Sequence, residues 1–210
     1  MIRVIIVDDH VVVRKGLKQI FEETQDIVVT DEASSGDELL EKITKYKYDL
    51  ILLDISMPVK DGLETLKEIK LYNPDIPVLI FTMFPEEQYA VRVLKAGASG
   101  YINKESQPEE LIEAIRKVTK GRKYISSYLR ELLAINLETS SESPIHETLS
   151  DREFQVLCLI ASGKTMKEIA QYFSLSINTI STYRTRILEK MSLHSNAELT
   201  HYAIKNQLVG

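Results

Sequence analysis

The chain has 210 residues, of which 44% are hydrophobic and 27% charged, a composition typical of a globular protein long enough for two domains. Composition excludes a membrane protein, since no apolar run nears the roughly 20 residues of a spanning helix. A single cysteine and a start without signal-peptide features make a cytoplasmic location the expectation. Residues 1–121 carry 16 Lys and Arg against 22 Asp and Glu, whereas residues 148–210 carry 7 against 5, so any affinity for nucleic acid should belong to the second half.

Apolar runs alternate with helical patterns through the first 121 residues. The predicted strands are 2–7, 27–32, 48–53, 76–81 and 99–103. The predicted helices are 12–24, 36–46, 61–72, 86–96 and 108–120. Because the strands are continuously apolar, helices should cover both faces of a parallel sheet. Residues 1–121 are therefore predicted to form an α/β domain, a five-stranded doubly wound parallel sheet of flavodoxin-like type.

A second, smaller domain is predicted after a linker. Residues 122–147 form the linker, with a helix at 126–137 followed by a stretch rich in Ser, Glu and Pro. Residues 148–210 are predicted to be all-α, because three Ser/Thr-x-x-Glu capping boxes mark helix starts. These boxes are Ser150 with Glu153, Thr165 with Glu168, and Ser195 with Glu198.

Polar side chains stand at the carboxyl ends of four predicted strands. They are Asp8 and Asp9, Asp54, Thr82 and Lys104. The ends of parallel strands meet at one edge of the sheet, where carboxylates and a backbone carbonyl suit Mg²⁺. Phosphoryl transfer to Asp54 fits this set, with Asp8, Asp9 and the Ser56 carbonyl as metal ligands and with Thr82 and Lys104 on phosphate oxygens. A lone Asp at a strand end is usually a cap or a turn residue, so it is the convergence that favours function.

The helix that begins after Ser176 has two contrasting faces. An apolar stripe contains Ile177, Ile180, Ile187, Leu188 and Met191, and the opposite face carries Asn178, Ser181, Thr182, Thr185 and Glu189. With a preceding helix at 166–173 and the turn 174–176, this predicts a helix-turn-helix. The residues expected to contact DNA are Asn178, Thr179, Ser181, Thr182, Arg184, Thr185, Arg186 and Lys190. By pattern alone, a small helical bundle with a polar surface fits equally well.

The segments VIIVDDH, DLILLDISMPVKDG, VLIFTMF and LKAGASGYINK resemble the receiver domain of two-component response regulators across residues 1–121. This resemblance implies that Asp54 accepts a phosphoryl group from a sensor histidine kinase, with Mg²⁺ held by Asp8, Asp9, Asp54 and the Ser56 carbonyl. It also implies that Thr82 and Tyr101 form a switch pair. Glu105 departs from the family, since many receivers have proline there.

The run LSDREFQVLCLIASGKTMKEIAQYFSLSINTISTYRTRILEKM resembles the LuxR-type helix-turn-helix. The domain order resembles the NarL/FixJ family, and ISTYRTRI and NAELTHYAI resemble its GacA/UvrY branch. The resemblance implies a transcription regulator that binds double-stranded DNA, dimerises on phosphorylation and is not an enzyme. Ser181 and Tyr183 depart from the Lys and His that relatives often carry, and Arg184 stands at a position that is usually apolar.

Three other interpretations fit parts of the sequence. A metal-dependent phosphohydrolase would use Asp54 as nucleophile, but its second Asp is replaced by Ser56, so turnover should be poor. A receiver that acts as an adapter without phosphate is disfavoured by the intact acidic set. Dinucleotide binding is disfavoured because no G-x-G-x-x-G follows the first strand.

Overall fold

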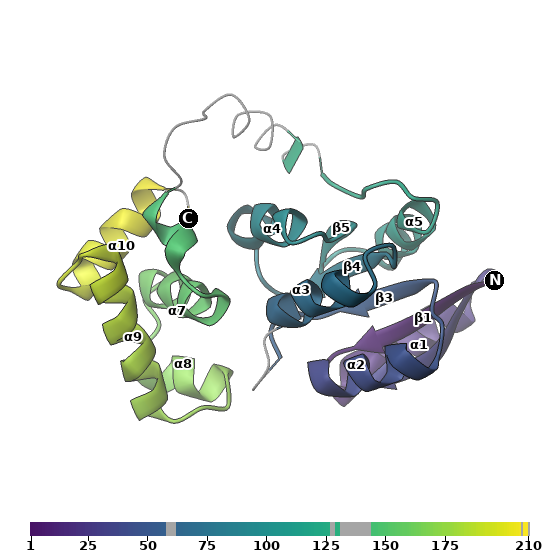
Figure 1. Cartoon of the computed structure of the whole chain (residues 1–210), viewed down its shortest axis with the longest axis horizontal. Coiled ribbons are helices and arrows are strands. Elements are labelled where there is room, and N and C mark those ends of the chain that lie inside the picture. The colour runs from purple at the N-terminus through teal and green to yellow at the C-terminus, as the bar shows by residue number, and fades with distance from the viewer. Residues whose placement is uncertain (58–61, 127–128, 131–143, 207, 210) are drawn as a thin grey trace. The chain divides into compact units, whose positions relative to one another are not determined.

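The computed structural model describes residues 1–57, 62–126, 129–130, 144–206 and 208–209. The chain divides into two compact units, Met1–Arg130 and Glu131–Gly210 (Figure 1). Among the described residues, no helix combines the length and the apolar character needed to cross a membrane.

The first unit is built on five parallel strands. They are β1 (Ile2–Val7), β2 (Ile27–Ala33), β3 (Leu50–Leu53), β4 (Val78–Thr82) and β5 (Gly100–Asn103). Their order in the sheet is β2-β1-β3-β4-β5, which is a doubly wound order that reverses between β1 and β3. The predicted fold is confirmed, and the carboxyl edge of β1 and β3 is where such sheets bind ligands.

Helices cover both faces of this sheet. They are α1 (Val11–Glu22), α2 (Gly36–Lys45), α3 (Gly62–Tyr72), α4 (Glu86–Lys95) and α5 (Pro108–Val118). Side chains of α1 and α5 pack with Val4 and Ile6 in one core. The alternate residues Ile5 and Val7 point to the other face and are also buried. Burial on both faces explains why these strands are continuously apolar rather than alternating.

The chain that leaves α5 pairs with the edge of the sheet. The Tyr124 N–H donates to the Ser99 carbonyl at 2.9 Å, and the Tyr101 N–H donates to the Tyr124 carbonyl at 3.3 Å. The first compact unit extends to Arg130, and the boundary of the receiver at residue 121 stays a prediction. Most of the linker helix predicted at 126–137 lies outside the described residues.

The second unit is helical, as predicted. Its elements are η1 (Ile145–Thr148), α7 (Asp151–Ala161), α8 (Met166–Tyr172), α9 (Ile177–Met191) and α10 (Asn196–Lys205). Residues 145–147 were predicted to be linker, but η1 belongs to this unit because the His146 ring contacts the Tyr202 hydroxyl at 3.0 Å. The capping boxes at Ser150 and Thr165 are confirmed.

The third predicted capping box is only half formed. The Ser195 hydroxyl accepts from the Glu198 N–H at 3.2 Å, as expected. The Glu198 carboxylate, however, accepts from the His194 N–H at 2.8 Å instead of the Ser195 N–H. The Glu198 carboxylate therefore accepts from the backbone N–H one residue before the N–H that the motif predicts.

Two glycines should respond to alanine in opposite directions. A Cβ on Gly100 would lie 2.7 Å from the Tyr124 carbonyl oxygen, so Gly100→Ala should destabilise the first unit by about 1–3 kcal/mol. A Cβ on Gly16, inside α1, meets no atom within 4 Å, so Gly16→Ala should stabilise it by about 0.5–1 kcal/mol. Urea unfolding of the full chain measures both changes; shifts of the same sign would contradict this assignment of the two glycines.

Candidate metal centre and nucleic-acid interface

Three charged side chains meet at the carboxyl edge of the sheet. Asp8 follows β1, Asp54 follows β3, and Lys104 follows β5. The Lys104 Nζ lies 2.6 Å from Asp8 Oδ2 and 2.7 Å from Asp54 Oδ2, and both carboxylates are buried. The structure therefore brings together the residues that the sequence placed on separate strand ends.

The electrostatics of this cluster are dominated by burial. Burial raises the pKa of Asp8, and the charge of Asp54 raises it further, although the attraction of Lys104 opposes both effects. Burial lowers the pKa of Lys104, but its ion pairs with Asp54 and Asp8 outweigh the burial, so that pKa is raised. One ammonium thus faces two carboxylates in a poorly solvated environment. The cluster has one more negative than positive charge, which favours binding of another cation.

The donor atoms at this edge fit a divalent cation. One ligand atom each from Asp8, Asp9, His10 and Asp54 lies within 4.8 Å of the others. Asp9 Oδ1 is buried and accepts no hydrogen bond within the described part of the chain, although His10 Nδ1 stands 2.9 Å away. The Ser56 N–H orients Asp54 by donating to its Oδ1 at 3.0 Å. Carboxylate oxygens of this number and spacing suit Mg²⁺ better than Zn²⁺.

The predicted switch residues are connected through the backbone of Phe84. The Thr82 hydroxyl lies 3.1 Å from the Ser56 hydroxyl and accepts from the Phe84 N–H at 3.4 Å. The Tyr101 hydroxyl donates to the Phe84 carbonyl at 2.6 Å, and the Tyr101 ring is buried. Both hydroxyls are thus attached to one residue of the loop between β4 and α4.

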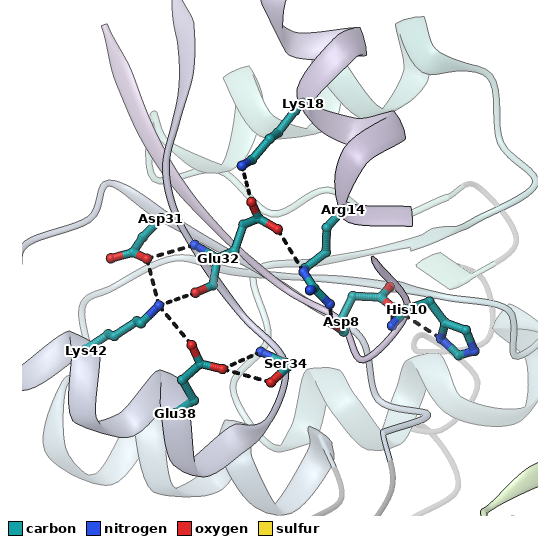
Figure 2. Close-up of polar contacts among 9 residues, drawn as sticks. All are labelled: Asp8, His10, Arg14, Lys18, Asp31, Glu32, Ser34, Glu38 and Lys42. Carbon is teal, nitrogen blue, oxygen red and sulfur yellow. Dashed lines mark hydrogen bonds and ion pairs between the residues drawn. The ribbon is translucent and has the colours of Figure 1, made fainter. Parts of the chain in front are cut away.

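One contact at the acidic edge was not predicted from the sequence. The Arg14 guanidinium, on α1, donates to the Asp8 carbonyl at 2.6 Å and to Glu32 at 2.8 Å (Figure 2). Arg14 stands five residues after Asp9, which was the available signal, but its partner Glu32 comes from β2.

A hollow adjoins the same edge. It has a volume of about 390 Å³ and reaches from α1 to Lys104. Its lining residues are His10, Val13, Gly16, Leu17, Ile20, Phe81, Met83 and Lys104. Nearby on α1, Val11 is 51% and Val12 is 82% exposed, so two adjacent apolar side chains lie next to the acidic residues.

The two faces of α9 are as predicted except at its first residue. The apolar residues Ile180, Ile187, Leu188 and Met191 are buried. Ile177 was predicted to join them but is 49% exposed, because at the helix start it lies beyond the packed turns. The polar face is exposed at Asn178, Ser181, Thr182, Thr185 and Glu189.

Two of the three basic residues expected to contact DNA, Arg184 and Lys190, are already engaged within the second unit. Arg184 Nε donates to Asn196 Oδ1 at 2.6 Å. Lys190 Nζ lies 2.7 Å from Glu153 Oε2. Burial raises the pKa of Glu153, but the hydrogen bonds from Lys190 and Ser150 outweigh it and hold that pKa below its usual range. A phosphate contact by Lys190 would have to share or break this ion pair, whereas Arg186 is exposed.

Two hydroxyls on the polar face are bonded to their own helix. Thr182 donates to the Asn178 carbonyl at 2.9 Å, and Thr185 donates to the Ser181 carbonyl at 3.1 Å. In these rotamers the hydroxyl oxygens can only accept hydrogen bonds from a ligand. Donors of that kind in the major groove are the amino groups of adenine and cytosine.

Comparison with known proteins identifies both units. Residues 4–116 match the response regulator receiver domain, and residues 147–203 match the luxR family of bacterial regulatory proteins. The chain is 36% identical to the response regulator UvrY of Escherichia coli strain K12 over 210 residues, covering 99% of this chain and 96% of UvrY. It is 37% identical over 210 residues to the response regulator GacA of Pseudomonas protegens, covering 100% of this chain and 98% of GacA.

A solved structure resembles the whole chain. It is RcsB from Salmonella enterica serovar Typhimurium bound to promoter rprA in the presence of phosphomimetic BeF3-. The TM-score is 0.62 at 26% identity, covering 96% of this chain and 97% of that one.

Lys104→Met should make the first unit depend on a divalent cation. Without its ammonium, Asp8 and Asp54 repel each other, so the unfolding temperature should fall in the absence of Mg²⁺. Added Mg²⁺ should then raise it further in the variant than in the native chain, because the competing positive charge is gone. Thermal unfolding with and without Mg²⁺ measures this, and equal Mg²⁺ shifts in both proteins would contradict it.

Arg186→Ala and Lys190→Ala should differ in their effect on DNA binding. Arg186→Ala should lower the salt slope of DNA affinity by about one, since a free cation releases one counterion. Lys190→Ala should lower the slope less and should also destabilise the second unit, because Glu153 loses its partner. Titrations at several salt concentrations, on a duplex that the chain selects from a random-sequence pool, measure both slopes. A larger change for Lys190→Ala would mean that its ion pair opens on DNA.

Proposed function

The chain belongs to the NarL/FixJ family of response regulators, which join a receiver to a LuxR-type DNA-binding domain, and from that premise we propose that phosphorylation of Asp54 controls its binding to DNA. Its role is transcription regulation, and its family is not a family of enzymes. The observation that carries the proposal is the convergence of Asp8, Asp54 and Lys104 at the carboxyl edge of the sheet.

The phosphoryl donor is a phosphohistidine of a sensor kinase. A carboxylate oxygen of Asp54 attacks phosphorus, and the new P–O bond forms as the P–N bond breaks. The phosphohistidine ring carries a proton on its other nitrogen, so the histidine leaves as a neutral imidazole. The Ser56 N–H holds the Asp54 carboxylate in place by donating to Oδ1, which leaves Oδ2, now on Lys104, as the oxygen that attacks. Lys104 then shifts from that carboxylate to an oxygen of the phosphoryl group, and Thr82 donates to another.

The metal ligands are Asp8, Asp9 and Asp54, together with the backbone carbonyl of Ser56. When bound there, Mg²⁺ supplies positive charge that offsets the repulsion between the carboxylates and the incoming phosphoryl group. Asp9 Oδ1 supports this assignment, because it is buried without a hydrogen bond among the described residues.

The kinase docks on α1 beside the acidic edge. The hollow of about 390 Å³ there is lined in part by Lys104, whose ammonium is hydrogen-bonded to Asp54. A side chain that enters the hollow would therefore come close to Asp54. Exposed Val12, at the same end of α1, offers apolar area for a helical partner. Both features support a partner that presents its phosphohistidine from an apolar surface.

The switch consists of Thr82 and Tyr101. When the Thr82 hydroxyl turns toward a phosphoryl group it gives up its contacts with Ser56 and the Phe84 N–H. The loop that carries Phe84 then changes its bonds with Tyr101, which gives the phosphorylated and free forms different contacts.

The output is a homodimer on double-stranded DNA in the cytoplasm. Two copies of α9 would enter successive major grooves, about one helical turn apart. The contact residues are Asn178, Thr179, Ser181, Thr182, Arg184, Thr185, Arg186 and Lys190. Two further solved structures that resemble this chain support a dimer on DNA: one contains two RcsB dimers bound to two parallel DNAs, and the other is the complex of the response regulator RcsB with DNA.

Multiple turnover is not part of this function. A phosphohydrolase with an Asp nucleophile needs a general acid two residues later, and Ser56 stands at that position. Ser56 has no carboxyl group, and its hydroxyl is engaged with Thr82. We therefore expect hydrolysis of the aspartyl phosphate to be slow.

A small phosphodonor should phosphorylate the chain once and raise its DNA affinity. We expect a single added phosphoryl group by intact mass, at least about tenfold tighter binding to the selected duplex, and dimers by sedimentation. Asp54→Ala is the control and should show none of these changes. A native chain that gains the phosphoryl group but matches Asp54→Ala in affinity and sedimentation would disprove the coupling. A native chain that gains none, or phosphate on Asp54→Ala, would disprove the acceptor.

A further inference from the structure

Both backbone polar groups of Asp8, its N–H and its carbonyl, form hydrogen bonds. Its N–H donates to the Ala33 carbonyl of β2 at 3.1 Å. Its carbonyl accepts from Arg14 Nη1 of α1 at 2.6 Å. That carbonyl belongs to the peptide between Asp8 and Asp9, so Arg14 holds the plane of the one peptide that joins the two carboxylates (Figure 2).

Arg14 is itself held in one orientation. Its Nε donates to Glu32 Oε2 at 2.8 Å, and only 13% of its side chain is exposed. The guanidinium is planar, so fixing Nε against Glu32 also fixes the direction in which Nη1 points. Glu32 is shared with Lys18, and hydrogen bonds from Lys18 and Arg14 hold the pKa of Glu32 below its usual range.

An irregularity in the sheet brings Glu32 to this position. The pairing of β1 with β2 shifts between Val4 and Ile5: Val4 faces Val29, whereas Ile5 faces Asp31. The extra residue in β2 re-aims the strand, as such bulges do next to functional sites. Glu32 then lies opposite Ile6, two residues before Asp8, within reach of α1.

We propose that Arg14, held by Glu32, is a positioning residue for the divalent cation: it fixes the Asp8–Asp9 peptide so that both carboxylates face the ion. This inference rests on the proposed function of the acidic edge. Arg14 contacts no ligand oxygen, so it acts through the geometry of the peptide, as second-layer residues do at metal sites.

Lys42 provides the matched control. It lies on α2 and pairs with Asp31 at 2.8 Å and Glu38 at 3.0 Å, so it anchors the same strand by the same kind of ion pair. It also bonds the Glu32 carbonyl, but Asp8 and Asp9 are not among its partners. Figure 2 shows Arg14 and Lys42 on the two sides of β2. A purely structural role would make the two cations equivalent.

The test measures Mg²⁺ affinity and unfolding stability separately in the full chain. Arg14→Met should weaken Mg²⁺ binding about tenfold, followed by NMR chemical shifts during a Mg²⁺ titration. Lys42→Met should lose comparable stability in urea but keep its Mg²⁺ affinity within about twofold. Arg14→Lys should recover part of the affinity, because an ammonium can reach the carbonyl but is not held by a planar pair.

Two results would overturn the proposal. The first is an Arg14→Met affinity equal to that of the native chain. The second is a loss of affinity in Arg14→Met and Lys42→Met that follows their loss of stability. If Arg14→Met does not fold, Glu32→Gln takes its place and should weaken Mg²⁺ binding more than Lys42→Met. A native chain that binds no Mg²⁺ would instead disprove the proposed function of the acidic edge.

Discussion

Two buried carboxylates that share one ammonium set the character of the first unit. The register of β1 with β3 pairs Val7 with Leu53, so the residues that follow, Asp8 and Asp54, must emerge side by side. Their repulsion in a poorly solvated place would be costly if Lys104 did not lie between them. Lys104 follows β5, with β4 between it and β3, so only a long side chain can reach across. A sheet that has to hold this cluster together is ready to take up a further cation or a phosphoryl group.

The sequence was sufficient for the acidic edge because that edge follows from local patterns. Each strand is an apolar run, each run ends at a polar residue, and parallel pairing gathers those ends without further information. The role of Arg14 could not be predicted in this way. Its contact with the Asp8 carbonyl depends on Glu32, and Glu32 is in place only because the pairing shifts at Val4 and Ile5. Such a shift arises from packing between strands and leaves no signature in either strand alone.

The second unit shows the same limit on its surface. Helical periodicity correctly divided α9 into buried and exposed faces, but it takes no account of where the helix begins. Ile177, the first residue of α9, was therefore wrongly predicted to be buried. The ion pair of Lys190 with Glu153 joins residues 37 apart, and local spacing cannot reveal it. Lys190, which was expected to contact DNA, therefore already forms an ion pair within the second unit. DNA binding itself came from the resemblance of the helix-turn-helix run, since the polar face alone also fits a small bundle.

A short series of hydrogen bonds connects Thr82 with the segment that follows α5. The Phe84 N–H is bonded to the Thr82 hydroxyl and the Phe84 carbonyl to the Tyr101 hydroxyl. The backbone N–H of Tyr101 then donates to the carbonyl of Tyr124, which lies in the segment after α5. A ligand shifts a conformational equilibrium only by binding its states differently, and a Thr82 side chain that turns toward a phosphoryl oxygen would move its hydroxyl away from the Phe84 N–H. If Asp54 is phosphorylated as proposed, this competition would act on Phe84 and Tyr101, and the Tyr101 backbone N–H links them to the Tyr124 carbonyl at the edge of the sheet.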